Sequence, residues 1–325
     1  MRAPKFWENT GLITFVLKPF SYFWQAAGCL RHLTTKPYQA PMPVLCIGNV
    51  VAGGAGKTPV ALDLLHRLRH RGHTPWALTR GYGGEQTGPL LIDPQHHTAA
   101  DVGDEALLLA EVAPTLVARN RPDGARLAAA HGAPALILDD GLQNPSLAKD
   151  LSLLVIDGAY GIGNGQIMPA GPLRESLSSA IDRCHAVILI GINVHGIASL
   201  LPKTKPILRA RFIPDNAATF SGQRIIAFAG IGRPEKFAES LRDAGAEVID
   251  FRSFGDHHPY QEAEISQLIA DARAAKAQLV TTAKDYVRVP SQFRDQVRVF
   301  RIKIAWNNVQ EIENLLDSFL TKGSG

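Results

Sequence analysis

The chain has 325 residues, enough for about two domains, and its 46% hydrophobic and 20% charged residues are typical of a folded globular protein. The net charge of +4 is already reached within the first forty residues, so the remainder is balanced, which argues against a broad nucleic-acid-binding surface. Cys29, Cys46 and Cys184 lie far apart and form no CxxC pair, so neither a zinc site nor a disulfide framework is expected.

Residues 1–40 combine aromatic and basic side chains. They hold eight of the chain's aromatic residues (4 Trp, 6 Tyr and 13 Phe in all) and five Lys or Arg residues against one Glu. The apolar run 11–17 is too short for a bilayer-spanning helix, which needs about 20 residues. Rings and cations together are typical of a helix in the lipid headgroup region, so we expect a membrane-surface segment. A helix packed on the body of the protein is the alternative.

A glycine-rich loop follows an apolar run at 44–47 and precedes an apolar helical stripe that ends near Gly72. This order is typical of a phosphate-binding loop, in which glycines let backbone N–H groups turn toward phosphates. Lys57 is expected to reach the β- and γ-phosphates, and Thr58 to offer its hydroxyl to Mg²⁺. The strict motif would have glycine where Val51 stands. The expected nucleotide-binding residues are Gly53, Gly54, Ala55, Gly56, Lys57 and Thr58.

A second apolar run, 135–138, ends in Asp139 and Asp140, which are followed by Gly141. A strand beside the P-loop strand would bring Asp139 close to a bound Mg²⁺. A plain Asp-Gly turn is the alternative. Two acids behind a buried run, downstream of a P-loop, favour metal binding. We therefore predict Thr58, Asp139 and Asp140 as metal ligands.

Apolar runs recur along the first part of the chain and alternate with helical or loop segments. They lie at 44–47, 75–79, 115–118, 135–138, 152–156 and 186–190. This alternation is typical of a parallel sheet with helices on both faces. The predicted fold class is α/β, with a P-loop NTPase-type parallel-sheet domain and a second, smaller α/β domain.

Two polar motifs lie between the P-loop and Asp139. Thr79-Arg80-Gly81-Tyr82 ends an expected strand, where ligands bind in doubly wound sheets, although a surface glycine turn fits equally well. Gly103-Asp104-Glu105 opens an expected helix. By itself this second pattern favours a capping role, because acids are stabilised in the first turn of a helix.

Two further polar segments follow the strand that ends at Asp157. Arg174, in the loop 169–175, suits bidentate phosphate binding, or simply precedes a helix. The segment 254–260 contains Asp256, His257 and His258. These residues suit a proton-transfer unit better than a metal site, because no matching cluster of ligands occurs elsewhere. A polar loop is the alternative.

A second α/β pattern begins after a stretch interrupted by proline and glycine at 202–222. Strands are expected at 225–229, 248–251, 278–282 and 297–304, and helices at 234–244, 262–275 and 309–320. The predicted organisation is a membrane-surface segment at 1–40, a P-loop kinase domain at 41–218, and a smaller α/β domain at 219–325 that closes over the site.

Together these motifs resemble those of the tetraacyldisaccharide 4′-kinases, the lipid A 4′-kinases of Gram-negative bacteria. The resemblance runs from about residue 10 to residue 320. It rests on Gly48-Asn49 with the loop through Thr58-Pro59, on Arg-Gly-Tyr at 80–82, Gly-Asp-Glu at 103–105, Asp-Asp-Gly at 139–141 and Asp-His at 256–257. The family's P-loop also departs from the strict motif where Val51 stands.

The resemblance implies transfer of the γ-phosphate of ATP, with Mg²⁺, to the 4′-hydroxyl of a tetraacylated glucosamine disaccharide 1-phosphate at the cytoplasmic face of the inner membrane. Asp104 matches the family's base and His257 its partner, although His258 stands beside it. Asp139 and Asp140 match metal-binding acids. No nucleic-acid partner and no obligate protein partner is expected. Contacts to substrate or nucleotide are expected from Asn49, Arg80, Tyr82, Arg121 and Arg174.

A P-loop GTPase or ATPase of the assembly or metal-delivery type is the main alternative. Its mark would be a base-reading Asn/Thr-Lys-x-Asp motif, for which Thr282-Ala283-Lys284-Asp285 is a weak candidate in the second domain. A membrane-surface scaffold that binds nucleotide without turnover is a further alternative.

Overall fold

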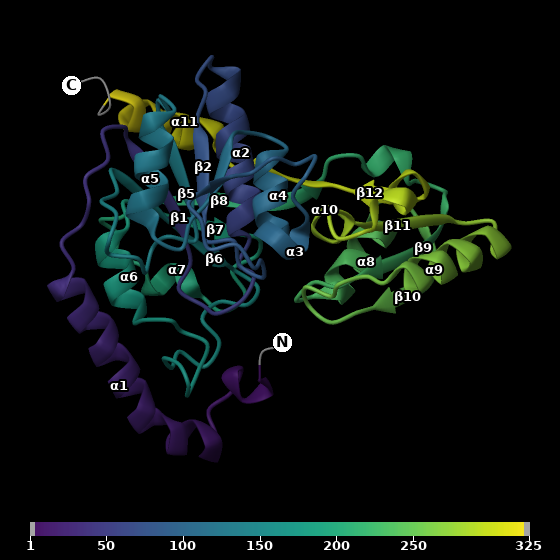
Figure 1. The fold of residues 1–325 in the computed structure, drawn as a ribbon. Coiled ribbons are helices and arrows are strands. Elements are labelled where there is room, and N and C mark those ends of the chain that lie inside the picture. The colour runs from purple at the N-terminus through teal and green to yellow at the C-terminus, as the bar shows by residue number, and fades with distance from the viewer. Residues whose placement is uncertain (1–3, 322–325) are drawn as a thin grey trace.

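The computed structural model describes residues 4–321, which form a large α/β body, a smaller α/β domain and a long N-terminal helix (Figure 1). Within this range nine strands build one sheet in the order β13-β8-β7-β6-β1-β5-β2-β4-β3. The seven strands from β8 to β4 run parallel, and antiparallel β13 and β3 close the two edges. The α/β class with a parallel-dominated sheet is therefore confirmed.

The strands of the large sheet and the helices around it have the following bounds. The strands are β1 Val44–Gly48, β2 Trp76–Thr79, β3 Leu90–Leu91, β4 Thr115–Val117, β5 Leu136–Asp139, β6 Leu151–Asp157, β7 Ala186–Ile190, β8 Ile207–Pro214 and β13 Ile302–Trp306. The helices are α2 Lys57–His70, α3 Ala99–Val102, α4 Asp104–Ala110, α5 Arg121–Ala130, α6 Leu177–Arg183, α7 Ile197–Leu200 and α11 Val309–Thr321.

The central strands are buried on both faces. In β1, Val44 and Cys46 pack into one apolar cluster, and Leu45 and Ile47 pack into the other. Successive side chains of a strand point to opposite faces, so a strand covered on both sides reads as a continuous apolar run. Because these strands run parallel, their carboxyl ends lie at the same end of the sheet, where the polar motifs follow the strands.

The smaller domain has a four-stranded parallel sheet in the order β10-β9-β11-β12. It lies beside the large body, with its own helices around the sheet (Figure 1). Its elements are the 3-10 turn η2 Ala217–Thr219, β9 Arg224–Ala229, α8 Pro234–Asp243, β10 Glu247–Ser253, α9 Glu262–Ala274, β11 Gln278–Thr282, α10 Ala283–Tyr286, the 3-10 turn η3 Ser291–Gln296 and β12 Arg298–Phe300.

The C-terminal residues differ from the expected second domain at 219–325. The single strand expected at 297–304 is two strands, β12 in the small sheet and β13 in the large one, separated at Arg301. Phe300 is buried in the small core, whereas Trp306 and Phe319 are buried in the large core. The apolar residues of this segment thus belong to two different cores, and residues 302–321 return to the large body.

Helix α1 (Leu12–Thr34) follows the turn η1 (Lys5–Trp7) and lies along the outside of the large body (Figure 1). Its buried residues are Thr14 and Ser21, and Ser21 Oγ donates to the carbonyl of Ile167 at 2.7 Å. Its large apolar residues are exposed, with Phe15 at 76% and Phe23 at 74%. Across residues 4–321, none of the helices combines the length and apolarity that crossing a bilayer requires.

Candidate active site

The P-loop lies between the end of β1 and the first residue of α2. Gly56 has a left-handed backbone (φ 86°), which a residue with a side chain rarely adopts, and α2 begins at the next residue. Lys57 Nζ lies 3.2 Å from Asn49 Oδ1 and 3.7 Å from Asp140 Oδ1. Asn49 is buried, and its amide also donates to the carbonyl of Val51. The structure therefore places Asn49 against the P-loop lysine.

The parallel register of the sheet brings Asp139 to the P-loop. Ile47 in β1 stands opposite Asp139 in β5, and Thr58 Oγ1 donates to Asp139 Oδ2 at 3.1 Å. Burial, reinforced by the charge of Glu105, raises the pKa of Asp139 to about 7. Its other oxygen, Oδ1, is buried without a hydrogen-bond partner. A buried carboxylate oxygen that lacks a donor suits a bound cation.

Asp140 and two arginines complete this group. Arg174 Nη1 lies 2.7 and 2.9 Å from the two carboxylate oxygens of Asp140. Burial alone would raise the pKa of Asp140, but Lys57 and Arg174 outweigh burial, so its pKa is lowered. Burial lowers the pKa of Arg121 to about 10, and its Nε has no hydrogen-bond partner. The P-loop edge thus gathers Lys57, Arg121 and Arg174 around two acids.

Asp104 is the first residue of α4 and follows Gly103, whose backbone conformation favours glycine. Gly103 has φ 89°, and a Cβ there would lie 2.5 Å from the carbonyl oxygen of Tyr82. The loop at 81–84 consequently packs directly against the first turn of α4. Tyr82 is 67% exposed, and its ring centroid lies 5.3 Å from that of His257. Arg80 is also exposed at this edge.

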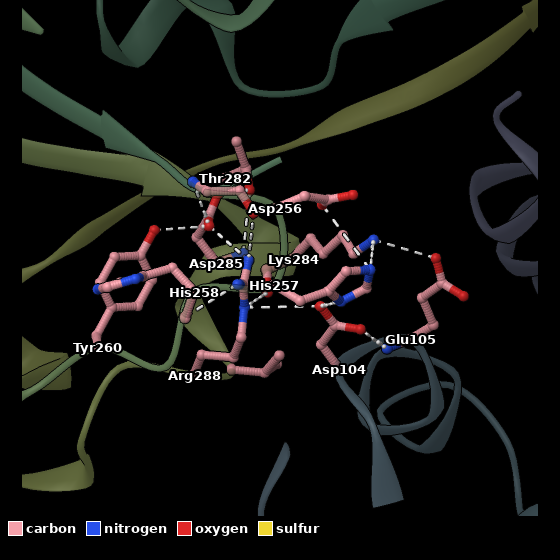
Figure 2. Close-up of polar contacts among 12 residues, drawn as sticks. Asp104, Glu105, Asp256, His257, His258, Tyr260, Thr282, Lys284, Asp285 and Arg288 are labelled. Carbon is pink, nitrogen blue, oxygen red and sulfur yellow. Dashed lines mark hydrogen bonds and ion pairs between the residues drawn. The ribbon is translucent and has the colours of Figure 1, made fainter. Parts of the chain in front are cut away.

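The smaller domain supplies the partner of Asp104. His257 Nδ1 lies 2.9 Å from Asp104 Oδ2 (Figure 2). Burial raises the pKa of Asp104, but the hydrogen bond from His257 and the charges of Lys284 and Arg288 outweigh burial, so its pKa falls below the ordinary range. The carboxylate is therefore ionised at neutral pH.

The neighbouring histidine has a different partner. His258 Nε2 lies 2.9 Å from Glu264 Oε2, and its ring stacks on Phe254 with centroids 4.8 Å apart. His258 consequently points into its own domain. Of the two adjacent histidines, the structure brings His257 to Asp104.

The sequence reasoning missed the roles of Lys284 and Arg288. Lys284 Nζ lies 3.2 Å from Glu105 Oε1, and Arg288 Nε lies 3.6 Å from Asp104 Oδ2. Asp285 is fully buried, and its oxygens accept hydrogen bonds from Thr282, Tyr260 and the backbone N–H of Gly230. The carboxylate of Asp285 is therefore fully hydrogen-bonded within the smaller domain and is not available to bind a nucleotide base. The i, i+4 spacing of Lys284 and Arg288 was the available signal.

The model of the tetraacyldisaccharide-1-P 4′-kinase family matches residues 13–321. The chain belongs to this family. It is 50% identical to the tetraacyldisaccharide 4′-kinase of Rhodospirillum centenum over 99% of this chain and 97% of the relative. It is 48% identical to that of Gluconacetobacter diazotrophicus over the full length of both chains.

A solved structure supports the same kinase fold. The "apo" form of LpxK from Aquifex aeolicus in complex with ATP superposes with a TM-score of 0.77 at 25% identity, over 95% of this chain and 100% of that one. The family membership expected from the ordered motifs is therefore confirmed. The individual roles of the site residues stay predictions.

Proposed function

We propose that this kinase transfers the γ-phosphate of ATP to the 4′-hydroxyl of a tetraacylated glucosamine disaccharide 1-phosphate, a step of lipid A biosynthesis. The observation that carries the proposal is the family match over residues 13–321, joined to a P-loop and to an ionised Asp104 that is hydrogen-bonded to His257. The occupied position of Asp285 argues against the GTPase alternative, because its oxygens are taken by internal donors.

The P-loop is proposed to bind the phosphates of ATP. Helix α2 begins at Lys57, directly after the glycine-rich loop, so backbone N–H groups of residues 53–58 are expected to donate to the phosphates, and Lys57 supplies a cation. Lys57 contacts Asn49 and Asp140. Binding of ATP would redirect its ammonium toward the β- and γ-phosphates.

Thr58, Asp139 and Asp140 are proposed to hold Mg²⁺. The residues fit this ion because they present hard oxygen ligands, and Asp139 Oδ1 is buried without a donor. A bound Mg²⁺ would neutralise charge on the transferring phosphoryl group. Asp139 and Thr58 already lie in contact, so the protein holds these oxygens in place.

Asp104 is proposed as the general base and His257 as its partner. A sugar hydroxyl is a weak nucleophile, and a positioned base contributes roughly 10²–10⁴-fold to the rate. Asp104 is 2% exposed and anionic, so it is able to accept the hydroxyl proton, and His257 orients the carboxylate. Because the two residues come from different domains, domain closure would assemble the pair and exclude water.

Binding of the acceptor is proposed to use exposed groups beside this pair. Tyr82 presents an aromatic ring next to His257, and Arg80 lies two residues earlier in the same loop. Arg174 and Arg121 are proposed to meet phosphates, with Asn49 orienting Lys57. Arg174 has to exchange its contact with Asp140 for such a ligand.

Helix α1 is proposed to dock on the membrane surface, and the proposed location is the cytoplasmic face of the inner membrane. The helix buries Thr14 and Ser21 against the protein and exposes Phe15, Phe23 and Leu33. Polar residues of α1 are thus buried while apolar residues are exposed, so that its apolar face has no protein partner among the described residues. Such a face with nearby cations suits the headgroup region of a bilayer.

The test is transfer of radiolabelled γ-phosphate from ATP to a purified tetraacylated disaccharide 1-phosphate in detergent with Mg²⁺. Wild type, Lys57→Ala and the exposed control Lys203→Ala are compared. Labelled lipid with wild type and the control, and none with Lys57→Ala, is the expected result. A folded wild-type protein that binds ATP but labels no lipid would overturn the proposal, and preferential turnover of GTP would favour the GTPase alternative.

A further inference from the structure

The segment after β11 places two cations against the Asp104–His257 pair. Lys284 Nζ lies 3.2 Å from Glu105 Oε1 and 3.4 Å from His257 Nε2 (Figure 2). Arg288 Nε lies 3.6 Å from Asp104 Oδ2. Neither cation has a part in the proposed transfer described above, although both come from the domain that supplies His257.

This segment is held rigidly by buried hydrogen bonds. The backbone N–H of Asp285 donates to Thr282 Oγ1, which caps α10, and the Thr282 hydroxyl donates to Asp285 Oδ2 at 2.6 Å. Asp285 Oδ1 accepts from Tyr260 at 2.7 Å and from Arg288 Nη2 at 2.6 Å. The position of Lys284 relative to His257 is therefore set by the fold of the smaller domain.

The contacts of His257 determine where its ring proton sits. An ammonium group only donates, so His257 Nε2 must present its lone pair to Lys284. The proton of a neutral ring then lies on Nδ1, which donates to Asp104 Oδ2 at 2.9 Å. Without a proton on Nδ1, two acceptors would face each other across this distance. Both contacts thus require the same tautomer.

The charged groups around His257 are Asp104 and Glu105 on α4, Asp256 in the loop of His257, and Lys284 and Arg288 after β11, with the phenol of Tyr82 against the ring. The three acids among them favour a cationic Lys284. Burial lowers the pKa of Lys284, but the nearby acids outweigh burial, so its pKa is raised. Asp256 Oδ1 competes for Nε2, at the longer distance of 3.8 Å.

We propose that Lys284 is a positioning residue, which fixes His257 as the Nδ1–H tautomer so that the imidazole donates to Asp104 and orients it to accept the hydroxyl proton. This inference rests on the proposed role of Asp104 as the base. Asp104 Oδ1 accepts the backbone N–H of Glu105 at 2.8 Å, and each carboxylate oxygen keeps a further lone pair for the incoming proton.

The first measurement is the tautomer itself, by NMR of the full chain labelled with ¹⁵N-histidine. His257→Gln assigns the His257 ring signals by difference. Wild type is expected to show Nδ1–H, and Lys284→Met is expected to move His257 toward Nε2–H, because Asp256 then faces Nε2 alone. Lys284→Arg is expected to keep the wild-type tautomer. Glu105→Gln is the matched control, because it breaks the ion pair but leaves the ammonium in place.

The second measurement is the pH dependence of lipid phosphorylation. Lys284→Met is expected to lower kcat about 10-fold with little change in KM for ATP. The acid limb of the pH–rate profile of this variant should move upward by about one pH unit, because the Lys284 ammonium helps to lower the pKa of Asp104. Lys284→Arg should recover most of kcat, and the exposed control Lys203→Met should match wild type.

A wild-type tautomer and a wild-type acid limb in Lys284→Met would overturn the inference, whatever the value of kcat. The same tautomer change in Glu105→Gln would overturn it too, because the ion pair and not the ammonium would then be responsible. Absence of phosphoryl transfer by wild type would instead overturn the proposed function, and the NMR result would still decide what Lys284 does to His257.

Discussion

Arg233 Nη2 and Asp157 Oδ2 form an ion pair at 2.8 Å, which joins the N-terminus of α8 in the smaller domain to the carboxyl end of β6 in the large sheet. The guanidinium also lies 5.3 Å from the ring centroid of Tyr160. The pair of Lys284 and Glu105 connects the smaller domain to α4, and this contact connects it to the large sheet at a second place. The ion pair of Arg233 and Asp157 can form only when the two domains are in contact.

Removing this ion pair should weaken the association of the two domains. Arg233→Ala is expected to lower kcat/KM for the lipid roughly 2–5-fold, since a partly exposed ion pair contributes about 1 kcal/mol or less. Steady-state kinetics provide the measurement. Arg242→Ala, an exposed position on the same helix, is the control and should match wild type. Equal losses in both variants would contradict a specific role for Arg233.

Asp285 should be a main stabilising residue of the smaller domain. Asp285→Ala removes the nearest counter-charge of Arg288, whose side chain is 6% exposed, and leaves it only the more distant Asp104 at 3.6 Å. We expect the free energy of unfolding to fall by about 3–5 kcal/mol. Urea denaturation followed by circular dichroism measures this change. Asp243→Ala, at an exposed helix end, should alter it by no more than about 0.5 kcal/mol, and a similar loss there would refute the prediction.

Gly103 should be required both for stability and for the position of Asp104. Gly103→Ala places a Cβ 2.5 Å from the carbonyl oxygen of Tyr82 on a backbone with φ 89°. Gly132→Ala also falls on a positive φ, 71°, but has open space around the new Cβ. We expect about 1 kcal/mol of destabilisation at Gly132 and at least about 2 kcal/mol at Gly103. Thermal unfolding compares the two, and only Gly103→Ala should also lose kinase activity.

The cysteines should differ sharply in reactivity. Burial raises the pKa of Cys46 and of Cys184 to about 11, so both remain protonated and inert at neutral pH. Cys29, on α1, is exposed. Maleimide should therefore modify Cys29 in the native protein, as read by mass spectrometry, and all three thiols after denaturation. Native labelling of Cys46 would show that the sheet opens more readily than its packing implies.

The same label offers a direct test of the membrane-surface proposal. An environment-sensitive fluorophore on Cys29 should respond to vesicles that contain anionic lipid, because α1 exposes Phe15 and Phe23 beside basic residues. Phe15→Ser with Phe23→Ser should weaken this response by about 10-fold or more, since burial of each ring contributes over 1 kcal/mol. An unchanged response in the double variant would exclude this face of α1 as the membrane contact.

The sequence alone determined the parts of this protein that depend on local patterns. The apolar runs and the glycine-rich loop predicted β1, the P-loop and α2, because a buried strand and a phosphate-binding turn each need particular residues at short spacing. The position of Asp139 beside the P-loop was also predictable, since neighbouring parallel strands end on the same side of a sheet.

The tertiary structure decided which distant residues meet. Asp104 and His257 are 153 residues apart. The residues around Asp104 favoured a capping role, and only the family resemblance implied the pair that the structure brings together. The choice of His257 over His258, and the position of Lys284 beside it, depend on how the two domains pack. The return of residues 302–321 to the large body could not be predicted from the sequence either, because a strand has the same apolar pattern in either core. Local periodicity reports that a face is buried, and only the packing of the whole chain determines what covers it.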